Sequence, residues 1–507
     1  MSPKIKIFRN GELIGNAEGV RGETVLETLS AGGVFLDAPC GGKGKCGKCL
    51  VRLSPNGDEV KACLTLVEGD MDIHLPQVMD MKIAGSAAEP TASGAVSDQL
   101  GVAVDIGTTT VVAHLTDLKT GVRIATASGV NAQRPYGADV ISRIQYCSEN
   151  GHETLTRLIR EQLAELIEKT CADSGVRRGD IRYITIAANT IMEHLAIGYS
   201  PVGMGIAPFT PVSLFGEELP AGDDLPVAKD AKIYFAPAIA SYVGGDITAG
   251  MLACDLENNQ GPAVFLDIGT NGEIAMKVGD KYYCCATAAG PAFEGAEISK
   301  GMAAISGAVS HVKWGDDLEL TVIGEAEPLG LCGSGLLDAL AVLLDTGAVD
   351  ETGRLLDPDE IPHAISKYIG ELDGKNVFWL SRKSGVYLSS VDVRKLQLAK
   401  SAIAAGIQTL LHEAGLSDSD VKGFFLAGGF GSYMDQTSAA TIGLFPESFL
   451  PVSRTMGNTA GEGSAMALVS EDARKTLTSI RERCEYIELS TSLYFNEQFV
   501  EQMMFEG

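Results

Sequence analysis

The alternation of polar and apolar residues divides the chain into a short β-rich segment and a long α/β segment. Lys4–Phe8 alternates between polar and apolar side chains and is followed by an Asn-Gly pair, which predicts a β-hairpin. A short helix is expected over residues 23–29, and further strands over residues 50–53, 60–66 and 71–75. We therefore predict a small β-rich domain over residues 1–78.

The periodic pattern is lost between residues 79 and 98, where the stretch AGSAAEPTASGAVSD contains small and polar residues without a repeat. Such a composition is typical of a flexible linker. We expect residues 79–98 to let the first domain move relative to the rest of the chain.

Beyond residue 99 the apolar runs predict buried strands and amphipathic helices. The helices are expected at Glu153–Cys171 and Val393–Ala414, the second ending at Gly415, with a buried strand at Tyr183–Ala187. The stretch GVAVDIGTTTVVAHL, which begins at residue 101, is matched by AVFLDIGTNGEIAMKV from residue 263. Because a strand, an Asp-x-Gly-Thr turn and a second strand occur twice, we predict a duplicated α/β unit, divided into residues 99–262 and 263–507.

Each Asp-x-Gly-Thr turn carries groups that could bind a polyphosphate. Backbone N–H groups and threonine hydroxyls can donate to phosphate oxygens. The aspartate can hold a hydrated Mg²⁺ or orient an attacking water. One such turn alone is more often an ordinary turn, but two copies, followed by the glycine-rich LAGGFG, favour a nucleotide site. The predicted catalytic residues are Asp105 and Asp267, and the predicted ATP-binding residues are Gly107, Thr108, Thr109, Gly269, Thr270, Asn271, Gly333, Ser334, Gly428, Gly429 and Gly431.

Four cysteines near the N-terminus have the spacing of a metal site, C-x5-C-x2-C-x13-C. They are Cys40, Cys46, Cys49 and Cys63, with several glycines between the first three. Glycine lets a loop turn tightly around an inorganic cluster and aim its N–H groups at sulfur, so an iron–sulfur centre is favoured. Tetrahedral zinc and a disulfide framework are the alternatives. Cys284 and Cys285 are adjacent on a predicted strand and therefore face opposite sides, which is typical of packing thiols.

Composition excludes some function classes. The net charge of −26 at pH 7 argues against a nucleic-acid partner, because the chain would repel a polyanion. No apolar run reaches the length of a membrane helix and no signal peptide is recognisable, so we expect a cytoplasmic protein with reduced thiols and no membrane partner.

The motifs together resemble known families. The cysteine spacing is similar to that of 2Fe–2S ferredoxins, although the last cysteine comes sooner than in plant-type or adrenodoxin-type members. VDIGTTT, LDIGTNGEI and LAGGFG resemble the two phosphate loops and the adenosine loop of the ATPases shared by actin, sugar and acetate kinases, and heat-shock chaperones. A ferredoxin-like domain, a linker and this ATPase resemble the reductive activators of corrinoid-dependent methyltransferases. Further matching stretches are NAQRPYGADVISRI, NTIMEHL, SYVGGDI, GPAFEGAEI, LCGSGLLDAL and VRKLQLAKSAI.

The resemblance implies an α/β multidomain protein with an N-terminal β-grasp 2Fe–2S ferredoxin domain and a duplicated RNase H-like, actin-like ATPase. The implied cofactors are a 2Fe–2S cluster, held by the four cysteines, and ATP with Mg²⁺. The implied activity is that of an ATP-hydrolysing iron–sulfur reductase, which returns the Co(II) corrinoid of a methyltransferase corrinoid protein to Co(I). The implied partners are that corrinoid protein and a low-potential electron donor, and a homodimer is left open.

Two other functions are weighed against this one. An activator of a 2-hydroxyacyl-CoA dehydratase or benzoyl-CoA reductase shares the ATPase fold but holds a 4Fe–4S cluster between two subunits. A small-molecule kinase with a redox sensor is the other alternative. Two residues are also ambiguous from sequence alone. Asp246 is either a cleft carboxylate or an exposed turn residue, and Ser334 either lines the nucleotide site or caps a helix.

Overall fold

The computed structural model describes residues 2–9, 11–32, 34, 36, 42, 44, 49–54, 57–75, 99–431 and 433–505. Predicted linker residues 79–98 and the cysteines at positions 40 and 46 lie outside this part of the chain.

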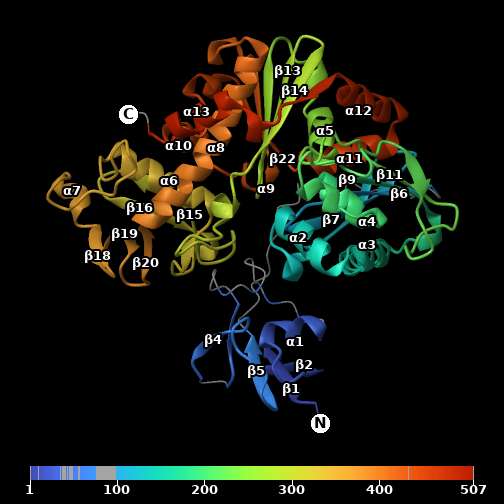
Figure 1. Ribbon diagram of the computed structural model, residues 1–507, viewed down its shortest axis with the longest axis horizontal. Helices are drawn as coiled ribbons and strands as arrows, with labels where there is room; N and C mark the ends of the chain where they lie inside the picture. The colour runs from blue at the N-terminus through green and yellow to red at the C-terminus, as the bar shows by residue number, and fades with distance from the viewer. Residues whose placement is uncertain are drawn as a thin grey trace.

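The N-terminal strands form a mixed sheet in the order β2-β1-β5-β3-β4, drawn in blue in Figure 1. The predicted hairpin is confirmed, because β1 and β2 pair antiparallel, whereas β1 and β5 pair parallel. Helix α1 begins at a capping box between Thr24 and Glu27. The elements are β1 Lys4–Arg9, β2 Glu12–Glu18, α1 Val25–Ala31, β3 Leu50–Arg52, β4 Glu59–Lys61 and β5 Met71–Leu75.

The strand predicted over residues 60–66 is wrong in extent. Strand β4 ends at Lys61, and the chain turns over residues 62–64. The apolar residues that extended the alternating pattern, Leu64 and Leu66, are 62% and 49% exposed instead of packing on the sheet. The turn places the Cys63 sulfur 3.3 Å from the sulfur of Cys49, which immediately precedes β3.

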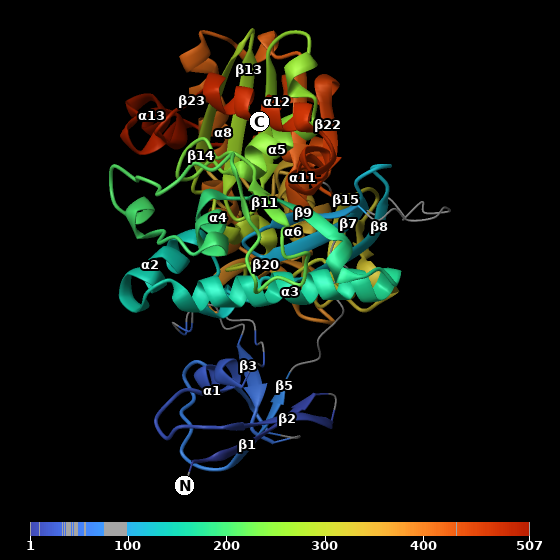
Figure 2. The same cartoon turned by 90° about the vertical axis from the view of Figure 1, so that its right-hand side faces the viewer.

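The chain from residue 100 to 235 builds a sheet in the order β10-β11-β9-β6-β7-β8. Apolar side chains of its strands and of α3 form one core, and the predicted helix at residues 153–171 runs three residues further, to Ser174. Figure 2 shows α3 lying across one side of this part of the molecule. The elements are β6 Leu100–Ile106, β7 Thr110–Asp117, β8 Arg123–Val130, α2 Val140–Asn150, α3 Glu153–Ser174, β9 Ile181–Ala188, α4 Thr190–Ile197, β10 Glu218–Pro220 and β11 Lys232–Phe235.

The second sheet has the order β22-β21-β12-β13-β14-β23 and repeats the plan of the first. In each sheet an Asp-bearing strand, β6 or β12, pairs antiparallel with the strand that follows it and parallel with a later strand, β9 or β21. This is the arrangement expected from two copies of one α/β unit. The elements are β12 Ala263–Ile268, β13 Gly272–Val278, β14 Lys281–Thr287, α8 Ser390–Ala414, β21 Gly423–Ala427, α9 Gly428–Gly431, β22 Ser453–Gly457, α12 Glu471–Arg483, β23 Cys484–Tyr486 and α13 Leu493–Glu501.

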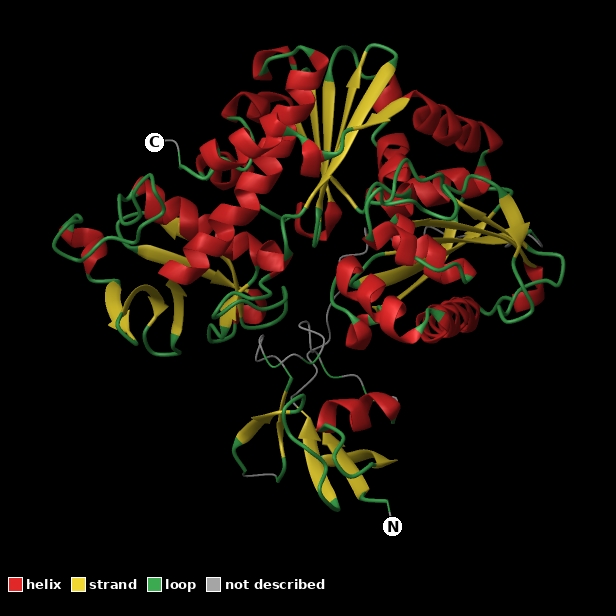
Figure 3. Cartoon of the chain, viewed as in Figure 1, coloured by secondary structure: helices red, strands yellow, loops and turns green. Residues whose placement is uncertain are grey.

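Between β14 and α8 the chain forms two small antiparallel or mixed sheets, shown at the left of Figure 3. They pack into the same large core as the second sheet, beside α6 and α8. Helix α8 ends at Gly415 in the left-handed conformation, as predicted. The elements are β15 Ala308–Trp314, β16 Leu318–Val322, β17 Gly330–Leu331, α6 Gly333–Asp345, α7 His363–Ser366, β18 Ile369–Leu372, β19 Lys375–Ser381, β20 Val386–Ser389 and α10 Gln436–Thr441.

Two helices join the sheets. Helix α11, Thr459–Val469, comes from the second half of the chain but packs against α5, Gly245–Ala253, and against β6 and β9. The contact is close, because a Cβ at Gly463 would lie 2.1 Å from the Ala249 carbonyl oxygen, and the Ser464 hydroxyl donates to the Thr185 carbonyl at 2.9 Å. The Asp-bearing ends of β6 and β12 are thereby fixed relative to each other. In the described residues, no helix is long and apolar enough to cross a membrane.

Candidate functional site

The two motif aspartates lie at equivalent places in the two sheets. Asp105 is the penultimate residue of β6, and Asp267 is the penultimate residue of β12. Burial raises the pKa of Asp105 to about 6. Burial, together with the negative charge of Asp105, raises the pKa of Asp267 to about 7. Because their charges interact and both residues are partly exposed, the fold brings the two predicted catalytic carboxyls to one place, called the cleft below, although they are far apart in sequence.

Asp246 is a third carboxyl of this cleft. It stands in the first turn of α5 and accepts a hydrogen bond from the Ile247 N–H at 2.9 Å. Burial, followed by the charges of Asp267 and Asp105, raises its pKa to about 8. The exposed-turn interpretation of Asp246 is therefore wrong. Three carboxyls in one cleft suit a hydrated Mg²⁺, which binds few protein ligands directly and keeps several waters.

Two asparagines that the sequence analysis did not select hold the first motif. The Asn458 amide donates to Asp105 Oδ2 at 2.8 Å, while its oxygen accepts from the Gly461 N–H and so caps α11. The Asn189 amide donates to the Thr108 hydroxyl at 3.1 Å, and Asn189 also caps α4. Each asparagine is an N-cap residue whose side chain also contacts the first motif. The sequences around Asn189 and Asn458 differ too much for a motif search to link the two residues.

Two buried glutamates also face the cleft. Burial, strengthened by the negative charge of Asp246, raises the pKa of Glu193 well above its usual range. Glu273 is affected in the same way by burial, Asp246 and Asp267. Burial thus favours the neutral form of both carboxyls. In the sequence, Glu193 stands out only as a glutamate that follows the apolar pair Ile191-Met192 in NTIMEHL, the segment that forms most of α4.

The second motif loop uses part of its hydrogen-bonding capacity internally. The Gly269 N–H donates to the Asn271 carbonyl at 3.0 Å, and the Thr270 hydroxyl donates to Glu294 Oε1 at 3.0 Å. These two predicted phosphate donors are thus already bonded within the protein. Their role toward a nucleotide stays a prediction.

The glycine-rich segment after β21 adjoins the second motif. Gly428 has φ +88°, and a Cβ there would lie 2.4 Å from the Ile268 carbonyl oxygen and 2.6 Å from Asp267 Oδ1. Only glycine fits this position without displacing the end of β12. A Cβ at Gly429 would meet no atom within 4 Å, so the backbone there borders open space, whereas Gly431 is buried.

The predicted residues Gly333 and Ser334 lie beside this segment at the start of α6. Phe293 and Phe430 stack with ring centroids 5.3 Å apart, and a Cβ at Gly333 would collide with both residues. The helix-cap interpretation of Ser334 is wrong, because Cys332 is the N-cap residue and the Ser334 hydroxyl donates to the Ser310 carbonyl at 2.8 Å. The fold thus brings the LCGSG and LAGGFG segments together.

Two of the four clustered cysteines lie in the described part of the chain. Cys49 and Cys63 are buried, and their sulfur atoms lie 3.3 Å apart, too far for a disulfide of about 2.05 Å. Gly42 and Gly44, both with positive φ, lie against Cys63 and Leu64. This pairing of thiols under a glycine-rich loop fits a thiolate-bound iron–sulfur or zinc centre.

In the described residues, no group of three or more Cys, His, Asp or Glu side chains has the geometry to hold a metal ion directly, and this includes the three aspartates. A Mg²⁺ beside them would therefore be held through its waters. Cys284 and Cys285 are both buried, as expected for packing thiols, and they belong to different hydrophobic cores on the two faces of the sheet.

Comparison with known proteins agrees with this architecture. A family model described as the RACo middle region matches residues 100–259, and one described as the C-terminal domain of RACo, the ASKHA domain, matches residues 261–507. A corrinoid activation enzyme, RamQ of Eubacterium limosum, is 30% identical, with 95% of this chain and 96% of that protein covered. The chain belongs to the RACo family. Its second half therefore has the actin-like ASKHA fold that LDIGTNGEI and LAGGFG predict.

Two other RACo-family similarities extend over much of the chain. The [Co(II) methylated amine-specific corrinoid protein] reductase of Methanosarcina barkeri is 27% identical, covering 68% of this chain and 66% of that protein. A solved structure, the reductive activator for a corrinoid, iron–sulfur protein, superposes with a TM-score of 0.71 and 28% identity, covering 99% of this chain and 98% of that one.

Part of the chain also resembles another protein. One component of the Na⁺-translocating NADH-quinone reductase of Chlamydia pneumoniae is 43% identical over 56 residues, which is 11% of this chain and 12% of that component.

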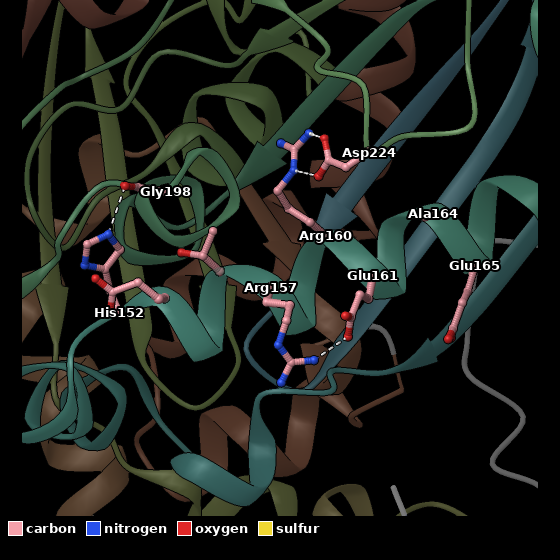
Figure 4. A pocket seen from close by; sticks show the side chains of 10 residues that line it. His152, Arg157, Arg160, Glu161, Ala164, Glu165, Gly198 and Asp224 are labelled. Carbon is pink, nitrogen blue, oxygen red and sulfur yellow. Dashed lines mark hydrogen bonds and ion pairs between the residues drawn. The ribbon is translucent and has the colours of Figure 1, made fainter.

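A surface pocket outside the cleft contains none of the predicted site residues of this RACo-family chain. Figure 4 shows it along α3, where Arg160 points to Asp224 and Arg157 points to Glu161. Both arginines are already neutralised by these carboxylates. The pocket therefore has no surplus positive charge for an anionic ligand.

Proposed function

We propose that the chain is an ATP-dependent reductive activator, which returns the inactive Co(II) corrinoid of a methyltransferase corrinoid protein to Co(I). The observation that carries this proposal is that one chain combines three interacting carboxyls, two of them in the Asp-x-Gly-Thr motifs, with a pair of adjacent buried thiols. A ferredoxin alone needs no ATPase, and a kinase needs no cluster. The names of RamQ and of the M. barkeri reductase support the choice of a corrinoid substrate.

In this proposal the cleft binds Mg·ATP. Asp105, Asp246 and Asp267 would hold the cation through its waters, and one of the carboxylates would orient the water that attacks the γ-phosphate. The loops at residues 107–109 and 269–271 bind the phosphates, and the segments at residues 333–334 and 428–431 border the adenosine. The ASKHA family model for residues 261–507 supports a nucleotide site there.

The thiols hold the redox centre in this proposal. Cys49 and Cys63, with Cys40 and Cys46 of the same loop, would ligate a 2Fe–2S cluster, which supplies one electron at a time when bound. The conversion of Co(II) to Co(I) consumes one electron, so the stoichiometry is satisfied by one transfer per cobalt. The match to a component of NADH-quinone reductase over 56 residues supports this assignment. A low-potential donor would restore the electron.

The decisive experiment uses the full-length protein, purified under anaerobic conditions, with a reductant and candidate corrinoid proteins. The Co(I) absorption is followed with ATP, with ADP and without nucleotide. We expect Co(I) to form readily only with ATP. Formation of a phosphorylated small molecule without any cobalt reduction would instead support the kinase alternative.

A further inference from the structure

A buried arginine behind the first motif loop has no charged hydrogen-bond partner in the described part of the chain. Arg143 of α2 is 0% exposed, and burial lowers its pKa only to about 9, so it is a cation at neutral pH. Buried arginines are usually paired with a carboxylate, because an uncompensated charge in the interior is costly. Here, however, each hydrogen bond of the guanidinium to a described residue ends on a neutral acceptor. These acceptors are the Gly137 carbonyl at 2.9 Å, Gln133 Oε1 at 3.0 Å, Met192 Sδ at 2.9 Å and the Thr108 carbonyl at 2.5 Å.

The bond to Thr108 belongs to a set that holds the carbonyls of the loop. The Asn131 amide donates to the Gly107 carbonyl at 2.8 Å, Arg143 donates to the Thr108 carbonyl, and the Asn131 backbone N–H donates to the Thr109 carbonyl at 2.9 Å. Three consecutive carbonyls are thus anchored by donors from outside the loop.

Peptide geometry then fixes the opposite side of the loop. In a trans peptide the C=O of one residue and the N–H of the next point in opposite directions. With the Gly107 and Thr108 carbonyls directed at Asn131 and Arg143, the N–H groups of Thr108 and Thr109 face away from these side chains. Successive N–H groups that point to one side form a binding place for an anion.

The neighbouring charges favour the same ligand. Arg134 contributes a second positive potential at Arg143, and only Asp139 and Cys147 oppose it. Asp139 is committed to capping α2, where it accepts from the Ser142 N–H at 2.7 Å. Asp139 thus offsets part of the positive potential to which Arg134 adds, but among the described residues no carboxylate hydrogen-bonds the guanidinium behind the loop. A phosphate group on the opposite side would neutralise that charge without contacting it.

We propose that Arg143 is the positioning residue of the first phosphate loop: it holds peptides 107–109 with their N–H groups toward a nucleoside triphosphate, and its charge is balanced by a phosphate of that ligand. The proposal rests on the proposed ATP-binding function and goes beyond it by assigning phosphate discrimination to a residue outside the motif. Arg143 contacts neither ligand nor water in this role, so its effect passes through the loop backbone.

The test uses full-length Arg143→Lys and Arg143→Met and measures the dissociation constants of ATP and of adenosine by equilibrium dialysis. The lysine variant keeps the charge but loses the fork of donors, and the methionine variant loses both. Losing a buried hydrogen bond to a charged group costs about 1.5–3 kcal/mol, which corresponds to roughly 10- to 100-fold in affinity. We expect ATP binding to weaken by about this factor in Arg143→Met and less in Arg143→Lys, with adenosine binding unchanged.

The matched control is Arg160→Lys. Arg160 also donates to backbone carbonyls, those of Ala196 and Ala221, but it is paired with Asp224 in the pocket of Figure 4. ATP affinity in this variant should equal that of the wild type. Melting temperatures of all variants are recorded, because a general loss of folding would weaken ATP and adenosine binding together.

If the Arg143 variants do not fold, Asn131→Ala provides the second test, since it removes the donor to the Gly107 carbonyl without exposing a charge. It should show the same selective loss of ATP affinity. Wild-type ATP affinity in the Arg143 variants, or a parallel loss of ATP and adenosine binding, overturns the proposal while the proposed function stands. Absence of ATP binding by the wild-type protein overturns both.

Discussion

At the residue scale, single substitutions of the cleft carboxyls test the proposed ATP hydrolysis most directly. Asp105→Asn and Asp267→Asn keep the shape of each side chain but remove the charge that a hydrated Mg²⁺ and an attacking water require. We expect each variant to lose about 10²–10⁴ in ATP turnover. Steady-state phosphate release from the full-length protein measures this effect.

The control for these variants is Asp173→Asn, on the exposed side of α3, which should hydrolyse ATP at the wild-type rate. Any visible spectrum from the proposed iron–sulfur centre should be the same in all three proteins as in the wild type, because the carboxyls lie outside the N-terminal sheet. Normal ATP turnover in both cleft variants would refute the two-loop site.

His194 gives a pH prediction at the same scale. Its Nε2 accepts backbone N–H groups from Val212 at 3.0 Å and Ser213 at 3.3 Å, and its Nδ1 bonds the Thr190 carbonyl at 2.6 Å. The ring is therefore neutral, and burial lowers its pKa to about 4. Since the unfolded pKa is about 6.5, the unfolded state binds more protons between pH 6.5 and 4, and folding stability falls as the pH falls through this window.

Between pH 7 and pH 5 this one histidine should remove roughly 2 kcal/mol of the free energy of unfolding. His194→Gln replaces the ring with a side chain that does not titrate, so its loss of stability over the same interval should be smaller by about that amount. Urea unfolding followed by circular dichroism measures the difference. The exposed His363→Gln should keep the wild-type pH dependence, and an identical dependence in His194→Gln would contradict the assignment.

Candidate site residues can be recognised in the sequence where they belong to a local motif. Residues that reach the site from distant segments of the chain cannot be recognised in this way. Asp105 and Asp267 were selected because each stands near the end of a buried strand within a repeated pattern. Arg143, Asn189 and Asn458 come from three other segments, and only the tertiary structure brings them to the first motif. A lone arginine in an amphipathic helix predicts a surface residue, so its burial could not be inferred.

At the scale of elements, the N-terminal turn after β4 carries a prediction about the redox centre. Cys63 lies in this turn, 3.3 Å from Cys49, which immediately precedes β3. Cys63→Ala should therefore remove one thiolate from the predicted centre, lower the iron content and bleach the visible bands. Iron analysis and absorption spectra of anaerobically purified protein provide the measurement.

Cys484→Ala serves as the control, because this cysteine lies on β23, in the second sheet of the ATPase part. Its iron content should equal that of the wild type. A full complement of iron in Cys63→Ala would show that another group is the fourth ligand. Zinc in place of iron in the wild-type protein would support the alternative that the cysteine spacing leaves open.

Elements were predictable where the pattern reflected burial. Helix α8 ends at Gly415, as its periodicity and its glycine signal indicated. For β4 the alternating pattern was misleading: it continued through two leucines that are exposed in the structure, whereas the strand ends at Lys61. The position of α11 could not be predicted at all. Its small residues permit the close contact with α5 and β9, but they do not specify which sheet it covers.

At the scale of the whole molecule, one hydrogen bond links the two large sheets directly. Asn458, which caps α11 and follows β22 of the second sheet, donates to Asp105 of the first sheet. A rotation of one sheet relative to the other would therefore change the surroundings of a cleft carboxyl. Nucleotide can favour one such arrangement only to the extent that it binds that arrangement more tightly.

The last prediction concerns coupling between this ATPase and the N-terminal domain. The sequence predicts a flexible linker of about 20 residues, which spans roughly 25 Å as a coil. A small domain on such a linker can move to bring its redox centre close to a cobalt buried in a partner.

We expect reductant, ATP and a cognate corrinoid protein to yield Co(I) with the intact chain. Residues 1–80 alone, and residues 1–80 mixed with residues 99–507, should yield much less, because separate pieces lose the high local concentration that a linker provides. The Co(I) absorption measures all three, and each preparation is first checked for its iron content and ATP hydrolysis. Equal rates with and without ATP in the intact chain would eliminate the coupling and leave an electron carrier beside an independent ATPase.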